Sequence, residues 1–148
     1  MDLIIKGFQD LTNKDVYEIM RARNEVFVVE QDCVYQDCDG KDIEAYHLFL
    51  MEKERIVAYL RILPAKVSYD EISIGRVLVV KDYRNKGLAR KILLEGINFI
   101  ENELFSKDIR ISAQAYLEKF YISLGFSKCS EIYLEDNIPY IEMIYDNN

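Results

Sequence analysis

The stretch VLVVKDYRNKGLAR, residues 77–90, decides the fold, because it joins a strand to a long helix through a short turn. Its first four residues are apolar and mostly β-branched, which is typical of a buried strand. Beyond Gly87, apolar residues recur at helical spacing as far as residue 104, which predicts a helix of about 18 residues. The N-terminus of a helix leaves backbone N–H groups unpaired and attracts phosphate. The stretch therefore favours a strand–turn–helix unit that binds an anion.

The turn also concentrates positive charge in an acidic chain. Arg84, Lys86, Arg90 and Lys91 flank Gly87, whose missing side chain lets the backbone approach an oxyanion closely. Taken alone, the turn is explained equally well by an ordinary turn glycine beside a solvated basic helix face. The GxxxxGK[ST] and GxGxxG patterns of nucleotide-binding loops do not occur. A second motif is needed to choose between the two interpretations.

Composition and charge exclude several classes of protein. The length predicts one domain, spanning residues 1–148. With 19 basic and 26 acidic side chains the formal net charge is −7, which argues against a general nucleic-acid binder. No apolar run approaches the ~20 residues of a membrane span, and no signal-peptide pattern opens the chain. Three cysteines, an odd number, favour a reducing compartment. We therefore expect a cytoplasmic protein without nucleic-acid or membrane partners.

The rest of the chain alternates short strands with a few helices. Thr12 and Asp15 have the spacing of a capping box, which predicts a helix starting there. A further short helix is expected over residues 116–124, closed by Gly125. Apolar or alternating runs predict strands over residues 3–8, 45–51, 56–63, 72–80, 108–113, 126–129 and 138–145. This order predicts an α+β, or three-layer α/β, domain with a mixed, mostly antiparallel sheet flanked by helices.

A second motif lies about 30 residues beyond the turn. The sequence FYISLGF, residues 120–126, follows Arg84-x-x-Gly87-x-Ala89 in the chain. Together the two motifs resemble those of the GNAT superfamily, the acyl-CoA-dependent N-acyltransferases, and the order of elements resembles that fold over nearly the whole chain. The segments RARNEVFVVEQ, residues 21–31, and YLEDNIP, residues 133–139, resemble the ElaA-like branch of that superfamily, in which a His often replaces Tyr140.

The resemblance implies a fold, a reaction and a set of binding residues. It implies a GNAT-like fold and transfer of an acetyl group from acetyl-CoA to a primary amine, by direct attack in a ternary complex. The acceptor would be a small-molecule amine or a protein amine, and a homodimer is an open alternative because many family members dimerise. By resemblance, backbone amides of residues 85–90 would hold the CoA pyrophosphate, and the strand backbone the pantetheine arm and acyl carbonyl. The implied cofactor-binding residues are Val77, Val79, Arg84, Asn85, Lys86, Gly87, Leu88, Ala89, Arg90 and Gln114.

Tyr121 is the catalytic residue that the resemblance implies. A phenol with a pKa of ~10 is protonated at neutral pH and can donate a proton to the departing thiolate. The pattern of its helix alone favours a core aromatic residue beside Phe120 and Leu124, and the resemblance reverses that interpretation. The oxyanion needs a donor, and a strand N–H near Val79 is a candidate. A base is also required, and the candidates are Glu30, Glu44, His47, Glu135 and Asp136.

Two functions of other classes stay open. One is a non-catalytic module that binds acyl-CoA and regulates a partner. The other is a thiol-redox or metal protein that uses Cys33 and Cys38. Their spacing is not that of a zinc site, and we expect no metal.

Three polar residues in apolar strands have two interpretations each. His47, the one histidine, is either a buried hydrogen-bonded residue or a catalyst. Arg61 and Arg76 either form structural ion pairs, with Glu44, Glu135 or Asp136 as partners, or clamp a substrate carboxylate.

Overall fold

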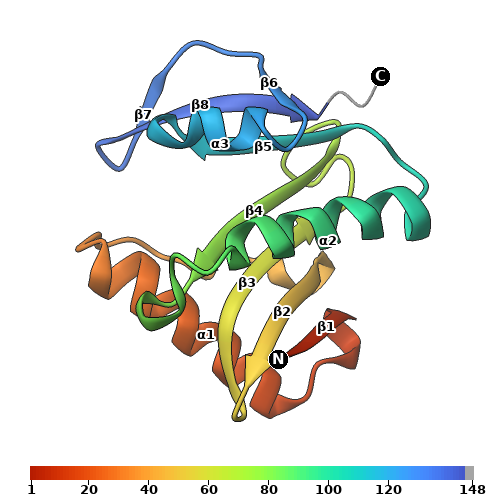
Figure 1. The fold of residues 1–148 in the computed structure, drawn as a ribbon, viewed down its shortest axis with the longest axis vertical. Coiled ribbons are helices and arrows are strands. Elements are labelled where there is room, and N and C mark those ends of the chain that lie inside the picture. The colour runs from red at the N-terminus through yellow and green to blue at the C-terminus, as the bar shows by residue number, and fades with distance from the viewer. Residues whose placement is uncertain (146–148) are drawn as a thin grey trace.

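One mixed sheet runs through the protein, with helices on both of its faces (Figure 1). The structure is a computed structural model, and it describes residues 1–145. The sheet strands are β1 (Asp2–Gly7), β2 (Tyr46–Glu52), β3 (Arg55–Leu63), β4 (Ile72–Val79), β5 (Ile109–Gln114), β6 (Phe126–Lys128), β7 (Tyr133–Glu135) and β8 (Ile138–Tyr145). The helices are α1 (Asn13–Arg23), α2 (Leu88–Glu103) and α3 (Glu118–Ile122).

The strands lie in the order β1-β2-β3-β4-β5-β8-β6, and β7 pairs with β8. Every neighbouring pair is antiparallel except β4 with β5, which are joined through α2 and run parallel. A parallel pair needs such a crossover. The predicted fold class, a mostly antiparallel mixed sheet between helical layers, is confirmed.

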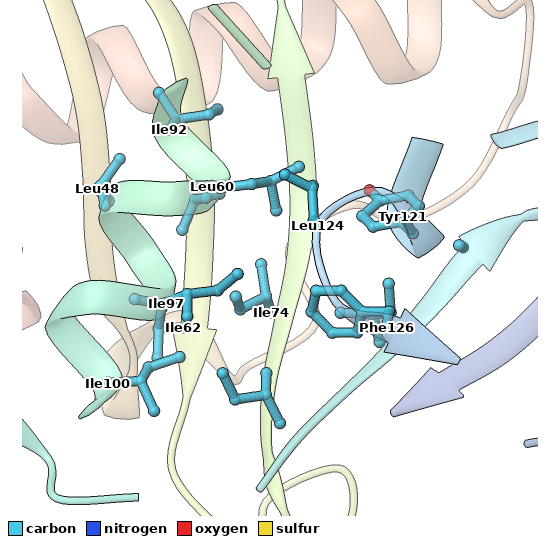
Figure 2. Close-up of a cluster of buried hydrophobic side chains, with 14 of the residues drawn as sticks. Leu48, Leu60, Ile62, Ile74, Ile92, Ile97, Ile100, Tyr121, Leu124 and Phe126 are labelled. Atoms are coloured by element: carbon cyan, nitrogen blue, oxygen red, sulfur yellow. The ribbon is translucent and has the colours of Figure 1, made fainter. Parts of the chain in front are cut away.

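Alternating residues of the central strands form two separate cores. Leu48 on β2 and Leu60 on β3 belong to the larger cluster, which packs under α2 and α3 (Figure 2). Their neighbours Phe49 and Tyr59 belong to a smaller cluster that packs against α1. Because successive side chains of a strand point to opposite faces, the two clusters lie on opposite sides of the sheet. This arrangement produces the three layers.

The first helix begins as expected and then changes its winding. The Thr12 hydroxyl accepts from the Asp15 N–H, and the Asp15 carboxylate accepts from the Thr12 N–H, each at 3.0 Å, so the capping box is confirmed. Beyond Arg23 the chain continues as a π-helix over Asn24–Glu30, which the sequence analysis did not predict. Such turns occur frequently at functional sites.

A bulge in β4 opens the sheet beside β5. Arg76 has a φ of +52°, and the register with β3 shifts there, so that Arg76 and Val77 together face Leu60. The parallel pairing of β4 with β5 extends only from Ile72 to Ile74. Beyond that point the two strands diverge, as Figure 1 shows. The second half of β4 therefore has a free edge that faces a gap in the sheet.

The final hairpin contains a strand that the sequence analysis missed. β7 pairs with β8 through a two-residue turn, Asp136 and Asn137, whose φ values are +51° and +63°. Positive φ at both positions is the pattern of a type I′ turn, which matches the twist of a hairpin. The turn places Glu135 and Asp136 beside the gap.

Two kinds of feature are absent from residues 1–145, a membrane-spanning helix and a metal-binding cluster. None of their helices combines the length and apolar character needed to cross a membrane. In the same residues no group of three or more His, Cys, Asp or Glu side chains is arranged to hold a metal ion.

Candidate active site

The turn between β4 and α2 presents a row of unpaired backbone donors. The first backbone hydrogen bond of α2 runs from the Lys91 N–H to the Gly87 carbonyl, at 3.1 Å. Across residues 1–145 no hydrogen bond engages the N–H groups of residues 85–90. Such a row at the positive end of a 16-residue helix suits an oxyanion.

The conformation of the turn leaves room for that oxyanion. Gly87 has a φ of +78°, in the left-handed region, and Asn85 has a φ of +64°. A Cβ atom built on Gly87 would meet no atom within 4 Å, so the space in front of it is open. The residues predicted to bind the CoA pyrophosphate therefore offer both unpaired N–H donors and enough open space for a phosphate group.

The free edge of β4 supplies a further donor. The Val80 N–H donates to the Val57 carbonyl at 2.9 Å, so Val80 faces β3. Because hydrogen-bonding direction alternates along an antiparallel pair, the N–H and C=O of Val79 point away from β3, into the gap. The Val79 carbonyl accepts from Arg84 Nε at 2.9 Å, which leaves its N–H as the free group.

A cleft of about 540 Å³ occupies the gap between the diverging strands. Val77 on β4 and Gln114 on β5 line it, as do Phe27 and Gln31 from the π-helix segment. Further lining residues come from the 33–42 loop, α3 and the β7–β8 hairpin, among them Cys33, Tyr35, Asp39, Tyr121, Glu135, Asp136 and Tyr140. Six parts of the chain, several of them distant in sequence, thus meet at one cleft.

Tyr121 reaches this cleft from the larger core cluster. The residue is 6% exposed, and its ring contacts Phe120 edge-on. It also contacts Phe126 edge-on (Figure 2). No hydrogen bond from residues 1–145 engages its hydroxyl, although Tyr121 lines the cleft. Burial raises the pKa of Tyr121 to about 12, so the phenol stays protonated throughout the neutral range. The side chain is both a core residue and an available proton donor.

A network of arginines and aspartates holds the 33–42 loop against the sheet. Arg23 is fully buried and bonds Asp37 at 2.7 Å and Asp42 at 2.6 Å. Arg61 bonds Asp39 at 2.9 Å, with both terminal nitrogens, and Asp42 at 3.1 Å. These hydrogen bonds hold the pKa of the Asp39 and Asp42 carboxyls below the usual range despite their burial.

The structure corrects the predicted partners of the two strand arginines. Arg61 pairs with Asp39 and Asp42, and Arg76 pairs with Asp37 at 2.9 Å and Asp39 at 3.4 Å. Glu44, Glu135 and Asp136, the predicted partners, form no ion pair within residues 1–145. Sequence spacing could not reveal the true pairing, because the carboxylates come from an irregular loop.

Removing one member of this network should be costly. Arg61→Ala removes the bidentate buried partner of Asp39 and one of the two buried partners of Asp42, and we expect a loss of about 3–5 kcal/mol in the free energy of unfolding. Arg55→Ala is the matched control, because Arg55 is 60% exposed and lies 4.0 Å from Glu18; we expect a change below about 1 kcal/mol. Urea denaturation measures both. Equal losses in the two variants would contradict the structural role of Arg61.

His47 is a structural residue on β2 rather than part of the cleft. Its Nε2 lies 2.9 Å from the Asp42 carbonyl, which can only accept, so Nε2 carries the proton. Its Nδ1 then accepts from the Tyr59 hydroxyl at 2.7 Å. Burial lowers the pKa of His47 from 6.5, which keeps the imidazole neutral. The prediction of a buried, hydrogen-bonded histidine is confirmed.

These pKa shifts predict how stability depends on pH. A lowered folded-state pKa means that the unfolded chain binds protons more readily, so stability is lost as pH falls. We expect the melting temperature to decline gradually below pH 6.5, the ordinary value for His47, and steeply below about pH 4, where Asp39 and Asp42 of the unfolded chain bind protons while the folded protein still holds both as carboxylates. Melting curves from pH 3 to pH 8 test this. His47→Gln should lose the first decline, and its retention would contradict the assignment.

Comparison with known proteins identifies the family. A family model described as an acetyltransferase (GNAT) domain matches residues 9–146. The chain belongs to the GNAT family. A UPF0039 protein of Schizosaccharomyces pombe is 39% identical to this GNAT protein over 145 residues, which cover 97% of this chain and 95% of that relative.

Two solved structures share both the fold and much of the sequence. An acyl-CoA N-acyltransferase from Pseudomonas aeruginosa superposes with a TM-score of 0.92 at 36% identity, over 99% of this GNAT chain and 100% of that one. ElaA of Escherichia coli superposes with a TM-score of 0.92 at 31% identity, over 98% and 99% of the two chains. The predicted GNAT-like fold and ElaA-like resemblance are confirmed, and the chain is an acyltransferase.

Within this GNAT protein the base candidates separate into two groups. Glu30 bonds Arg84 with both carboxylate oxygens, and that hydrogen bonding holds the pKa of Glu30 below its ordinary value. His47 is enclosed, and Glu44 is exposed and does not line the cleft. Glu135 and Asp136 line the cleft. They form no ion pair within the described part of the chain.

Several cleft residues of this GNAT protein were missed by the sequence analysis. Ser112 on β5 bonds the Tyr133 hydroxyl, and the Tyr133 ring stacks on Tyr140, with centroids 6.2 Å apart. Phe27 of the π-helix and Gln31, which directly follows it, also line the cleft. The one sequence signal for Ser112 was the alternation along β5. Ser112 lies between the buried residues Ile111 and Ala113, so its side chain is on the opposite face of the strand from theirs.

Proposed function

We propose that the protein is an N-acetyltransferase that moves an acetyl group from acetyl-CoA to a primary amine, by direct attack in a ternary complex. The observation that carries this proposal is the row of unpaired N–H groups at residues 85–90, which directly follows a free strand edge beside a polar cleft. The acceptor is a small-molecule amine or a protein amine that enters the cleft.

The binding roles follow from what each group offers. The backbone N–H groups from Asn85 to Arg90, with Leu88 and Ala89 between them, would bind the pyrophosphate, and the side chains of Lys86 and Arg90 would add positive charge. Within the described residues neither side chain has a carboxylate partner: Lys86 lies over the Tyr83 ring, and Arg90 bonds Ser123. The edge of β4 at Val77 and Val79 and the amide of Gln114 would hold the pantetheine arm. Acetyl-CoA, when bound, supplies the thioester whose carbonyl carbon the amine attacks.

The chain's own groups then move charge and protons. An N–H of the β4 edge, at Val77 or Val79, would donate to the oxygen on which negative charge develops. As the new C–N bond forms and the C–S bond breaks, the Tyr121 hydroxyl would give its proton to the sulfur. Glu135 or Asp136 would take a proton from the attacking nitrogen, because these carboxylates line the cleft and have no basic partner in residues 1–145.

A panel of primary amines tests the proposed function. Wild-type protein is mixed with acetyl-CoA and each amine, and release of free CoA thiol is followed with and without the amine. We expect at least one amine to accelerate release and to yield its N-acetyl product in equal amount. CoA at 100 times its Kd should also stabilise the protein by about 2.7 kcal/mol. The absence of any CoA-dependent thermal shift would contradict the proposal.

A further inference from the structure

Arg84 makes a three-point contact between two parts of the chain. Its Nε donates to the Val79 carbonyl at 2.9 Å, and its Nη2 donates to Glu30 Oε1 at 2.7 Å. Its Nη1 donates to the other oxygen of Glu30. A bidentate guanidinium–carboxylate pair fixes orientation as well as charge. All three nitrogens of Arg84 are therefore engaged without any ligand.

The residues joined by Arg84 each lie within two positions of a residue that lines the cleft, Gln31 or Val77. Glu30 is the last residue of the π-helix, next to the cleft residue Gln31, and Val79 is the last residue of β4. Val26 of the π-helix and Leu78 of β4 belong to the same buried cluster, so the two elements also share a core. The ion pair adds a polar contact between the end of the helix and the end of the strand.

The contact also changes what the β4 edge can offer. An extended ligand that pairs with a strand normally uses both the N–H and the C=O of alternate residues. At Val79 the carbonyl is taken by Arg84, so the residue offers a donor only. A ligand oxygen suits that position, whereas a ligand N–H does not.

We propose that Arg84 is a positioning residue and not a phosphate ligand: it keeps Val79 a donor-only site and locks the end of β4 to the end of the π-helix through Glu30. This proposal rests on the proposed function. Positive charge for the phosphates then comes from Lys86 and Arg90. Glu30, paired with Arg84, belongs to this positioning contact and is not the base.

The first arm of the test measures CoA binding at low and high salt, and it needs no acceptor. Arg84→Lys keeps the positive charge but cannot form the bidentate contact of the guanidinium. Glu30→Gln keeps the size of the side chain but loses the negative charge. For both we expect CoA Kd values within about fivefold of wild type, and an unchanged salt dependence. Lys86→Gln is the comparison variant, and it should weaken CoA binding and make that binding less sensitive to salt. If Arg84→Lys matches Lys86→Gln, or if Glu30→Gln tightens CoA by freeing Arg84, the proposal is overturned.

The second arm measures steady-state kinetics with an accepted amine. Arg84→Lys and Glu30→Gln should each lower kcat by about 10- to 100-fold, since small misplacements of reacting groups have effects of that size. The double variant should be no slower than the slower single variant, because both changes break one contact. Retained kcat in Arg84→Lys overturns the proposal. A protein that binds CoA yet acylates no amine contradicts the proposed function alone, and the binding arm then decides the role of Arg84.

Discussion

Tyr121→Phe is expected to lower kcat by about 10²- to 10⁴-fold, because it removes the proton donor proposed for the departing thiolate. The ring keeps its edge-on contacts with Phe120 and Phe126, and in residues 1–145 no hydrogen bond to the hydroxyl is lost. The melting temperature and the CoA Kd should therefore stay close to those of wild type. Steady-state kinetics, CoA titration and melting curves on both proteins provide the comparison.

The pH dependence sharpens this prediction. Burial raises the pKa of Tyr121 to about 12, so the acid stays protonated and wild-type kcat should show no decline from loss of this proton below about pH 10. Tyr17→Phe, on the exposed side of α1, is the matched control and should leave kcat unchanged. An unchanged kcat in Tyr121→Phe, with chemistry shown to limit the rate, would return Tyr121 to the role of a core aromatic residue.

Gly87→Val is expected to abolish CoA binding while the protein still folds. The valine side chain would enter the open space in front of the α2 N-terminus, where the pyrophosphate is proposed to lie. The φ of +78° also strains any β-branched residue, at a cost of about 1–3 kcal/mol in the free energy of unfolding. The CoA-dependent stabilisation of the wild type, about 2.7 kcal/mol at 100 times its Kd, should disappear in this variant.

Gly40→Val is the matched control for Gly87→Val, because it introduces the same backbone strain outside the proposed phosphate site. Gly40 has a φ of +82°, and a Cβ atom there would also meet no atom within 4 Å. It lies in the 33–42 loop and not in the turn that would bind the pyrophosphate, so we expect a similar loss of stability with the CoA-dependent shift retained. A full thermal shift in Gly87→Val would place the phosphate site elsewhere.

Local patterns in the sequence predicted the elements that carry the site. The alternation in residues 72–80, the glycine before a helical repeat and the capping box at Thr12 each depend on near neighbours, and the structure contains the corresponding β4, α2 and α1. The order of these elements, together with the motifs at residues 84–89 and 120–126, predicted the GNAT-like fold. The catalytic role of Tyr121 was predicted only from the motif, because the pattern of its helix alone indicates a core aromatic residue.

Features that depend on distant contacts were not predictable in this way. The ion-pair network joins Arg61 on β3 to Asp39 and Asp42 in an irregular loop, and no periodicity relates them. The π-helix over Asn24–Glu30 contains three valines and a phenylalanine, which have low helix propensity, so no local pattern indicated that the chain continues there as a wider helix. The strand β7 is three residues long and partly exposed, which is too short for an alternation to be recognised.

The mass of the intact protein, measured after mixing with acetyl-CoA, tests the central claim most directly. Direct transfer predicts that the protein mass is unchanged without an acceptor, and that adding an accepted amine yields acetylated amine and free CoA in equal amounts. A protein that gains the mass of one acetyl group before the amine is added, and loses it afterwards, would contradict the account. The acceptor would then react with an acyl-enzyme, and the half-buried thiol of Cys33 in the cleft would be the residue to examine.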